Sequence, residues 1–245
     1  GNFLLAGQVY EPRSDVHLET LLRIGNLCND AHLHQEGETG RWKITGDPTE
    51  GALVVVAEKA GMEHEIERGR YTRLNEIPFS SETKMMTTVH KVDAGNVAYT
   101  KGAPEEILAR SESIFRRGIV EPLNAAERDK IMTVAQDIAG NGLRVLGLAY
   151  KTVSQPADML DHSLVFVGLV GIIDPPREEV KGAIKLCQQA GIKSVMITGD
   201  HKLTAVTIAR ELGLLKGGLA LTGAELDQVT ERQFEEMVER VEVYA

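Results

Sequence analysis

The sequence predicts an α/β protein of two domains, in which an antiparallel sheet with flanking helices precedes a parallel sheet. Residues 71–101 form β-favouring runs separated by a turn at residues 93–95, a pattern typical of antiparallel strands. From residue 178 onwards, helical and short apolar segments alternate, as in a doubly wound parallel sheet. Between the two patterns lies Asp174-Pro-Pro-Arg177, a rigid break because each proline restricts its own backbone and the residue before it. We therefore expect domains at residues 1–173 and 174–245.

The composition favours a cytoplasmic protein that does not bind nucleic acid. The 245 residues carry a net charge of −9, whereas a protein that binds a phosphate backbone needs a basic face. A local cluster of Lys and Arg can still hold the phosphates of a nucleotide. Cys28 and Cys187 lie far apart in the sequence, which argues against a disulfide framework and favours a reducing compartment.

No segment has the length of a membrane helix. The longest apolar run, residues 164–173, has about half of the roughly 20 residues that such a helix needs. No signal sequence follows Gly1. We therefore expect a soluble chain, which is also compatible with a cytosolic piece of a larger membrane protein.

The first helix is predicted over residues 16–27. Ser14-Asp15 provides a cap, and the apolar residues that follow include the three- and four-residue spacings of an amphipathic helix. A short strand is expected at Trp42-Lys-Ile44.

The second helix has a clear start. Asp47 suits the cap, Pro48 the first turn, and Glu50 the third helical position of a capping box. The helix continues over residues 52–60, and Gly61 ends it.

The later elements follow from alternation, apolar runs and punctuation by Gly and Pro. In the first domain these are strands at residues 85–92, 96–100, 143–150 and 164–173, and helices at residues 104–110 and 125–139. In the second domain they are helices at residues 178–190, 201–212 and 230–240, and strands at residues 192–197, 219–221 and 241–244. Because the last predicted element is a strand, we expect the parallel sheet to be incomplete.

The stretch at residues 77–90 combines an aromatic ring, a lysine and two adjacent methionines, and a second lysine follows on the neighbouring predicted strand. A purine nucleotide needs such a set: a ring to stack on, an apolar wall such as Met86, and cations for its phosphates. Phe79 precedes polar residues at the edge of a turn, where stacking on a base contributes ~1–3 kcal/mol. The alternatives are a core aromatic at Phe79 and a solvated charge at Lys84.

Three further residues have two interpretations each. Lys101, followed by Gly102 and Ala103 that leave room for a ligand, either meets a phosphate or ring edge or is an isolated strand-end charge. Glu50 either accepts a hydrogen bond from an exocyclic amine or serves only the helix start. Arg144 is either a surface charge or a guanidinium that grips phosphate oxygens.

Thr198-Gly199-Asp200 is expected at the C-terminal edge of a parallel strand, where doubly wound sheets bind their ligands. The alternative is that Asp200 only caps the next helix. No His or Cys group has the spacing of zinc ligands, and no Walker-type loop occurs, so no metal site is predicted.

Six motifs, in this order, resemble the P-type cation-transporting ATPases. None is specific alone, but together they span nearly the whole chain, and two of them are similar to the type II branch that includes calcium, sodium and proton pumps. The motifs are Gly46-Asp-Pro-Thr-Glu-Gly-Ala-Leu53, Phe79-Ser-Ser-Glu-Thr-Lys-Met-Met86, Lys101-Gly-Ala-Pro-Glu105, Gly142-Leu-Arg-Val145, Asp174-Pro-Pro-Arg177 and Thr198-Gly-Asp200.

The resemblance implies a nucleotide-binding (N) domain over residues 1–173. Residues 174–245 would be part of a phosphorylation (P) domain, with an incomplete Rossmann-like sheet of the haloacid-dehalogenase type. Phe79 would stack on adenine, Lys101 would line the base pocket, and Arg144 would reach the phosphates. The implied cofactor-binding residues are Glu50, Phe79, Lys84, Met86, Lys101, Gly102, Arg144, Asp174 and Arg177, and the residues implied to face the transferred phosphate are Thr198, Gly199 and Asp200.

It also implies ATP with Mg²⁺ as ligands, and membrane helices, an actuator domain and the rest of the P domain as partners within a parent chain. Ser81 stands where many calcium pumps carry a basic residue, so one phosphate contact is expected to be missing. The family phosphorylates an aspartate in Asp-Lys-Thr-Gly-Thr, and this chain contains neither that motif nor the later Thr-Gly-Asp-Gly segment.

We therefore expect this cytoplasmic part of an integral membrane pump to bind ATP without turnover. One alternative is a haloacid-dehalogenase-like phosphatase with a large cap, which would need an Asp-x-Asp motif that residues 1–15 lack. Another is a non-catalytic nucleotide-binding module.

Overall fold

The computed structural model describes residues 2–37, 40–93, 95–156, 160–173, 176–199 and 202–245. The chain forms two compact units, of which unit 1 comprises Gly1–Ala135 and Val145–Ile172, and unit 2 comprises Gln136–Arg144 and Ile173–Ala245. Among the described residues, no helix is both long and apolar enough to span a membrane.

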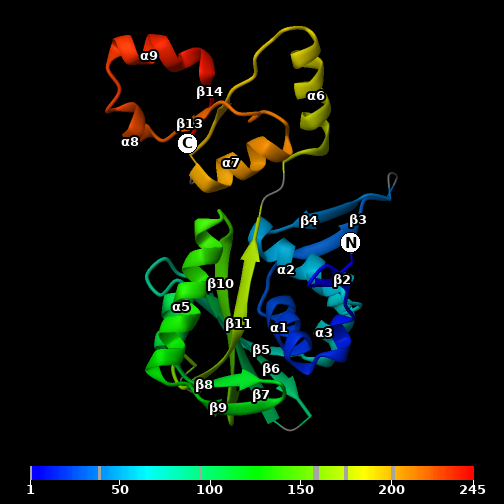
Figure 1. The fold of residues 1–245 in the computed structure, drawn as a ribbon. Coiled ribbons are helices and arrows are strands. Elements are labelled where there is room, and N and C mark those ends of the chain that lie inside the picture. Colours follow the sequence, from blue (N-terminus) through cyan, green and yellow to red (C-terminus); the bar gives the residue numbers. More distant parts are fainter. Residues whose placement is uncertain (1, 38–39, 94, 157–159, 174–175, 200–201) are drawn as a thin grey trace. The chain divides into compact units, whose positions relative to one another are not determined.

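Unit 1 is built on a seven-stranded sheet with the order β5-β6-β7-β10-β11-β8-β9 (Figure 1). Its strands are β5 (Arg73–Ile77), β6 (Met85–Val92), β7 (Gly95–Gly102), β8 (Ser111–Arg116), β9 (Ile119–Pro122), β10 (Arg144–Val153) and β11 (Leu164–Ile172). Strands β5, β6, β7 and β10 pair antiparallel in succession, whereas β11 pairs parallel with β8. The α/β fold class is therefore confirmed, although β11 and β8 are parallel in a sheet expected to be antiparallel.

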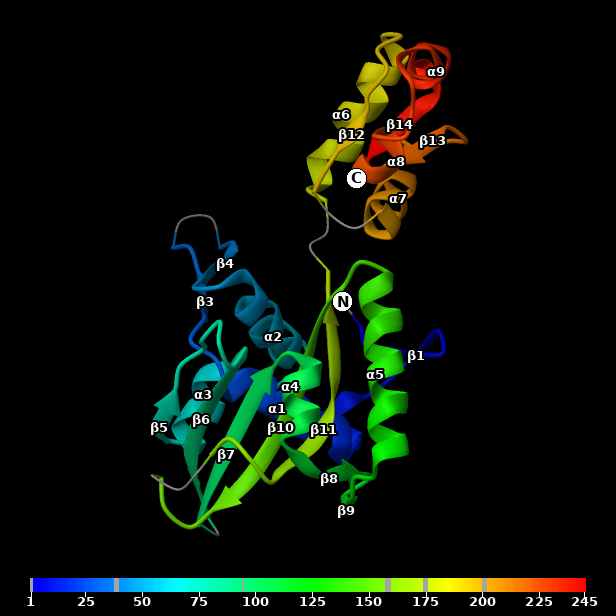
Figure 2. The ribbon, with the colours of Figure 1, turned by 90° about the vertical axis from the view of Figure 1, so that its left-hand side faces the viewer.

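Helices cover both faces of this sheet (Figures 1 and 2). Successive strand residues point to opposite faces, and Met86 packs with Ile24 and Leu27 while Met85 packs with Ile107. The first face therefore carries α1 and the second carries α4. The helices of the unit are α1 (Val16–Leu27), α2 (Pro48–Lys59), α3 (His64–Arg70), α4 (Pro104–Ala109) and α5 (Ala125–Gly140), with a 3₁₀ turn η1 at Pro12–Ser14.

Two small antiparallel ribbons complete unit 1. They are β1 (Leu4–Leu5) with β2 (Gln8–Val9), and β3 (His32–Gln35) with β4 (Trp42–Thr45).

Unit 2 has a three-stranded parallel sheet, in which β14 (Val241–Tyr244) lies between β12 (Met196–Ile197) and β13 (Leu219–Leu221). Val241 and Val243 of the central strand are fully buried. The helices are α6 (Glu178–Gln189), α7 (Lys202–Glu211), α8 (Gly223–Leu226), α9 (Glu231–Met237) and η2 (Val238–Arg240). The predicted alternation of helices and parallel strands is confirmed.

Several elements differ from the prediction. The strand expected at residues 192–197 is only Met196–Ile197. Strands β3, β8 and β9 and helix α3 were not predicted. Each is short, and their apolar residues do not form a long periodic pattern that a sequence reveals.

Candidate functional site

Lys101 is buried in unit 1, where its ammonium group has two partners. Only 7% of the residue is exposed. Its Nζ donates to Oε1 of Glu50 at 2.5 Å and to the backbone carbonyl of Cys28, also at 2.5 Å. A charge can be buried when it is paired and hydrogen-bonded, so this lysine has a structural reason for its position before any ligand is considered.

Glu50 uses both carboxylate oxygens at this position. Its Oε1 meets Lys101, and its Oε2 accepts a hydrogen bond from the backbone N–H of Asp30 at 3.1 Å. Its backbone carbonyl accepts a hydrogen bond from the buried Asn29 side chain at 2.9 Å. Glu50 therefore joins the start of α2 to the segment that follows α1.

The capping box predicted at α2 is half correct. Asp47 caps the helix, since its Oδ1 accepts from the backbone N–H groups of Thr49 and Glu50. The carboxylate of Glu50 is bonded instead to Lys101 and to the backbone of Asp30. In a capping box this carboxylate would accept a hydrogen bond from the backbone N–H of Asp47. It pairs with the buried ammonium group of Lys101, because a hydrogen bond from a charged donor is stronger than one from a neutral N–H.

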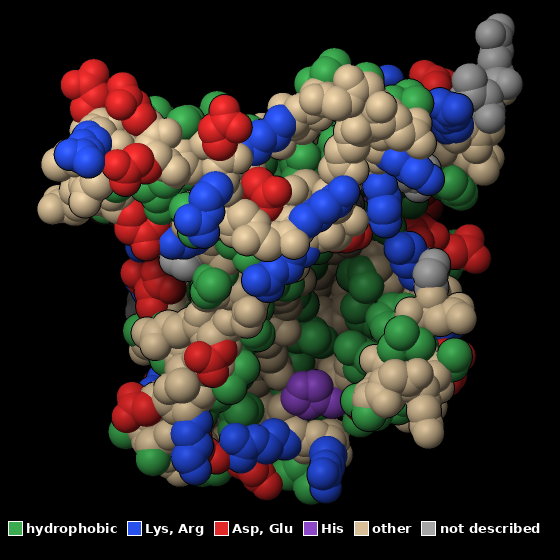
Figure 3. Space-filling view, turned by 45° about the horizontal axis from the view of Figure 1, so that its top comes forward, with side chains coloured by type: hydrophobic (Ala, Val, Ile, Leu, Met, Phe, Trp, Pro, Cys, Tyr) green, Lys and Arg blue, Asp and Glu red, His purple; other side chains and the backbone are tan. Residues whose placement is uncertain are grey.

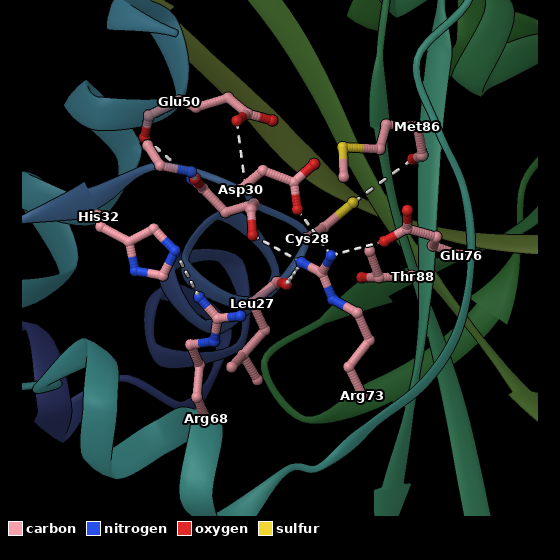
Figure 4. A network of polar contacts seen from close by, with 12 residues as sticks. Leu27, Cys28, Asp30, His32, Glu50, Arg68, Arg73, Glu76, Met86 and Thr88 are labelled. Atoms are coloured by element: carbon pink, nitrogen blue, oxygen red, sulfur yellow. Dashed lines mark hydrogen bonds and ion pairs between the residues drawn. The ribbon is translucent and has the colours of Figure 1, made fainter. Parts of the chain in front are cut away.

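Arg73 fixes the segment after α1 from the other side (Figure 4). Its guanidinium lies 2.6 Å from Asp30 and 2.7 Å from Glu76, and it donates to the carbonyls of Leu27 and Asn29. The four contacts hold the backbone that supplies the Cys28 carbonyl and the Asp30 N–H. Sequence reasoning missed Arg73, because a lone Arg at a strand start carries no signal of its carbonyl partners.

Gly102 is required by strand packing. Met85 of β6 pairs with Gly102 of β7, and a Cβ at this position would lie 2.4 Å from the carbonyl oxygen of Lys84. The space expected for a ligand on this side is thus filled by the neighbouring strand. The close approach brings the end of the 80–84 loop beside the strand that carries Lys101, and the N–H of Ala103 donates to the same Lys84 carbonyl at 3.0 Å.

Phe79 and Lys84 lie at the exposed rim beside this strand end. Phe79 is 62% exposed, which removes the alternative of a core aromatic. The loop after it is closed by hydrogen bonds from Lys84 N to Ser80 O and between Ser80 and Thr83. Lys84 is about half exposed and forms an ion pair with Glu105 at 3.3 Å. Lys and Arg side chains are common on the face drawn in Figure 3, so the net charge of −9 does not make the surface uniformly acidic.

Met86 is buried in the core. It pairs with Lys101 across β6 and β7, is 2% exposed, and packs against α1. Its carbonyl accepts a hydrogen bond from the Cys28 thiol, whose pKa is raised by burial. In this arrangement Met86 offers almost no surface to a ligand.

The other predicted residues lie in unit 2 or outside the described residues. Arg144 begins β10 and is exposed, and Arg177 is exposed before α6. Thr198 and Gly199 follow β12, as predicted for the C-terminal edge of a parallel strand, and the Thr198 N–H donates to the carbonyl of Tyr244. Asp174 and Asp200 lie outside the described residues.

Unit 1 also has a hollow of about 760 Å³ that contains none of the predicted residues. Its wall combines four aromatic side chains with polar ones, and burial raises the pKa of two of the tyrosines, Tyr99 and Tyr150. The lining residues are Thr20, Arg70, Tyr71, Val92, Asp93, Asn96, Val97, Tyr99, Phe115, Tyr150 and Thr152.

Comparison with known proteins supplies the family context for this geometry. A family model described as "P-type ATPase, cytoplasmic domain N" matches residues 17–179. "Calcium-transporting ATPase 1" of Bacillus cereus is 40% identical over 89% of this chain and 24% of its own length. "Calcium-transporting ATPase" of Bacillus subtilis is 37% identical over the whole chain and 28% of its own length, and "Cation-transporting ATPase pma1" of Synechocystis is 41% identical over 85% of the chain and 23% of its own length. The chain thus spans about a quarter of the length of the curated relatives it matches.

Proposed function

This chain belongs to the P-type ATPase family, and we propose that it is the ATP-binding cytosolic part of a membrane pump. The parent protein would couple ATP hydrolysis, through an aspartyl-phosphate, to the movement of a cation. The observation that carries the proposal is the exposed ring of Phe79, held by a closed loop beside the strand end that carries Lys101.

The roles proposed for the unit 1 residues follow from their exposure. Phe79 offers a free face for adenine, and the exposed Lys84 can exchange Glu105 for a phosphate oxygen. The buried Lys101 and its partner Glu50 are proposed to line the base pocket. Glu50 and the Cys28 carbonyl orient the ammonium group of Lys101. A ligand that contacts this ammonium group must therefore share it with both of these acceptors.

The residues fit ATP better than they fit a Mg²⁺ ion. Both oxygens of Glu50 already accept hydrogen bonds, one of them from a cation. Mg²⁺ prefers oxygen ligands and is commonly held by substrate phosphates, so we propose that it enters with ATP.

The unit 2 residues are proposed to act on the transferred phosphate and at the junction of the N and P domains. Thr198, Gly199 and Asp200 would face the phosphate, Arg144 would reach the nucleotide phosphates, and Asp174 and Arg177 would belong to the junction between residues 1–173 and 174–245. Phosphoryl transfer depends on positioning and charge neutralisation around a nucleophile. The chain contains no Asp-Lys-Thr-Gly-Thr segment, so we propose that it binds ATP without turnover.

The decisive experiment is a calorimetric titration of the 245-residue chain with ATP, with and without Mg²⁺, combined with an assay of phosphate release. We expect saturable binding and no phosphate release. Steady phosphate release would contradict the proposal and favour a phosphatase or a free-standing ATPase, whereas an absence of binding in a folded chain would exclude the proposed pocket.

Phe79→Ala is the sharpest variant because its ring is exposed. Loss of a stacking contact of ~1–3 kcal/mol should weaken ATP binding roughly five- to 150-fold. Ile119→Ala is the matched control, since Ile119 is 61% exposed on β9, at the edge of the sheet opposite to β5. Equal affinity of the Phe79→Ala variant and the unmodified chain would exclude stacking on Phe79.

The transported ion of the parent protein is proposed to be calcium, because two of the compared relatives are named calcium-transporting ATPases. The test is the ATP-dependent uptake of calcium, compared with sodium and protons, by the full-length protein in vesicles. Uptake of sodium or protons in place of calcium would refute this choice and leave the ATP-binding proposal intact.

A further inference from the structure

A second cluster of polar side chains lies in unit 1, between ribbon strand β3 and helix α3. His32, His64 and Glu65 each offer one ligand atom, and these atoms lie within 4.8 Å of one another. His32 and Glu65 are exposed and His64 is buried. The three residues show no ligand spacing in the sequence because His32 and His64 come from different elements.

The orientation of His64 is fixed by its buried neighbour. Asn26 is fully buried and donates through Nδ2 to the carbonyl of Met62, so its Oδ1 is an acceptor. Nδ1 of His64 lies 2.6 Å from this oxygen and therefore carries the proton. The Nε2 lone pair of His64 is left to face the cluster, which is the arrangement that second-sphere partners impose on metal-binding histidines.

The two imidazoles already converge on a cation. Nη1 of Arg68 lies 3.5 Å from Nε2 of His64 and 3.4 Å from Nε2 of His32. Figure 4 shows the guanidinium of Arg68 facing the His32 ring. The second nitrogen of His32 faces Glu65, with Nδ1 and Oε1 3.7 Å apart. Both Nε2 lone pairs thus point to one place that accepts positive charge.

We propose that His32, His64 and Glu65 form a binding site for a divalent transition metal, with Zn²⁺ as the ion that this ligand set fits. Two histidines and one carboxylate, with a fourth position open to water, are a common zinc ligand set. Zn–N distances are about 2.0–2.1 Å, so Arg68 must leave and His32 must move inward. His32 lies half-exposed on a two-stranded ribbon, and Arg68 reaches the cluster from the surface of α3, so neither movement disturbs the core.

Arg68 provides a test that distinguishes this site, because its guanidinium competes with the metal for the Nε2 lone pairs of His32 and His64. Removing its charge should strengthen Zn²⁺ binding by roughly fivefold or more, since the unit charge lies close to the bound ion. Surface histidines that bind zinc nonspecifically would not show this gain.

The test is a calorimetric titration of the 245-residue chain with Zn²⁺, repeated with Co²⁺, whose visible absorption reports its coordination. We expect one ion per chain. His32→Ala and Glu65→Gln should weaken binding by more than about tenfold, since they remove direct ligands, and Arg68→Gln should strengthen it. The three replaced side chains are exposed or half-exposed, so the variants should fold. His64 is not replaced, because it is buried and its loss would disturb folding.

His34→Ala is the matched control, because His34 lies two residues along the same strand and outside the cluster. Unchanged affinity in this variant supports the proposal. If His34→Ala weakens binding as much as His32→Ala while Glu65→Gln has no effect, the two strand histidines chelate the ion and the proposed site is wrong. A chain that shows neither heat with Zn²⁺ nor absorption with Co²⁺ also refutes it.

Discussion

The interiors of unit 1 and unit 2 differ in what they bury. The described part of unit 1 buries polar and charged side chains, including His64, Glu67, His90 and Lys101, and every buried side-chain polar atom of the described residues has a partner. In the described part of unit 2 the core is aliphatic, and Thr204 is its one buried polar residue. Buried polar networks fix one arrangement when every member is satisfied. The buried polar contacts of unit 1 therefore fix the residues of the proposed site, and unit 2 has no such network among its described residues.

The largest effect should come from breaking the Lys101–Glu50 pair. Lys101→Met leaves the carboxylate of Glu50, whose side chain is only 15% exposed, without its cation. Unpaired buried charges cost about 3–5 kcal/mol, so unit 1 should lose this much free energy of unfolding. Urea unfolding followed by the emission of Trp42, the single tryptophan and a residue of unit 1, measures the loss.

The double variant Glu50→Gln with Lys101→Met is the control for this prediction. It removes both charges, and such replacements are often nearly neutral. It should therefore regain most of the lost stability. If the single and double variants are equally stable, the unpaired charge of Glu50 is not the cause of the lost free energy of unfolding.

The aliphatic core of unit 2 should respond to lost volume. Leu212 is 7% exposed and packs in the main cluster of the unit. Leu212→Ala should cost about 2–5 kcal/mol through lost burial and a cavity. The urea midpoint of a circular dichroism transition should fall while the midpoint of Trp42 emission stays unchanged. An equal shift of both midpoints would show that the two units unfold together. The stabilities of their two interiors could then not be compared separately.

A structural feature was predictable from the sequence when the contacts that form it join residues that are close together in the chain. The starts of α1 and α2 were predicted because Asp15 and Asp47 bond to N–H groups two and three residues away. Strand β8 was missed because its pairing with β11 joins residues about fifty positions apart. The partner of Lys101 lies 51 residues away at Glu50, and no spacing rule connects them.

Acid should weaken unit 1 through His90. Burial, together with the nearby charges of Arg73 and Arg68, lowers the pKa of this side chain from 6.5 to about 4, although its hydrogen bond to the Tyr71 carbonyl opposes the shift. The unfolded chain therefore binds a proton that the folded chain resists, and the stability is lost as the pH falls from 6.5 to about 4. Between pH 7 and pH 5 the loss should be about 2 kcal/mol.

Urea unfolding at the two pH values measures this loss, and His90→Gln provides the reference, because its stability should depend less on pH. The comparison rests on how steeply the free energy of unfolding of the variant changes with pH, and its absolute value at one pH matters less. Equal slopes for the variant and the unmodified chain would show that His90 does not titrate in this range.

The smallest effect on stability should come from replacing Lys84, the exposed lysine of the proposed site. Lys84 forms an exposed pair with Glu105, in which both side chains are about half exposed, and such pairs contribute ~0.2–1 kcal/mol. Lys84→Ala should therefore leave the urea midpoint of unit 1 almost unchanged while it weakens ATP binding in calorimetry. Lys101→Met cannot make this distinction, because a loss of binding there follows equally from a lost contact and from a disturbed interior. An unchanged ATP affinity in Lys84→Ala would show that Lys84 is only a surface charge, and the proposed phosphate contact would have to come from a residue other than Lys84.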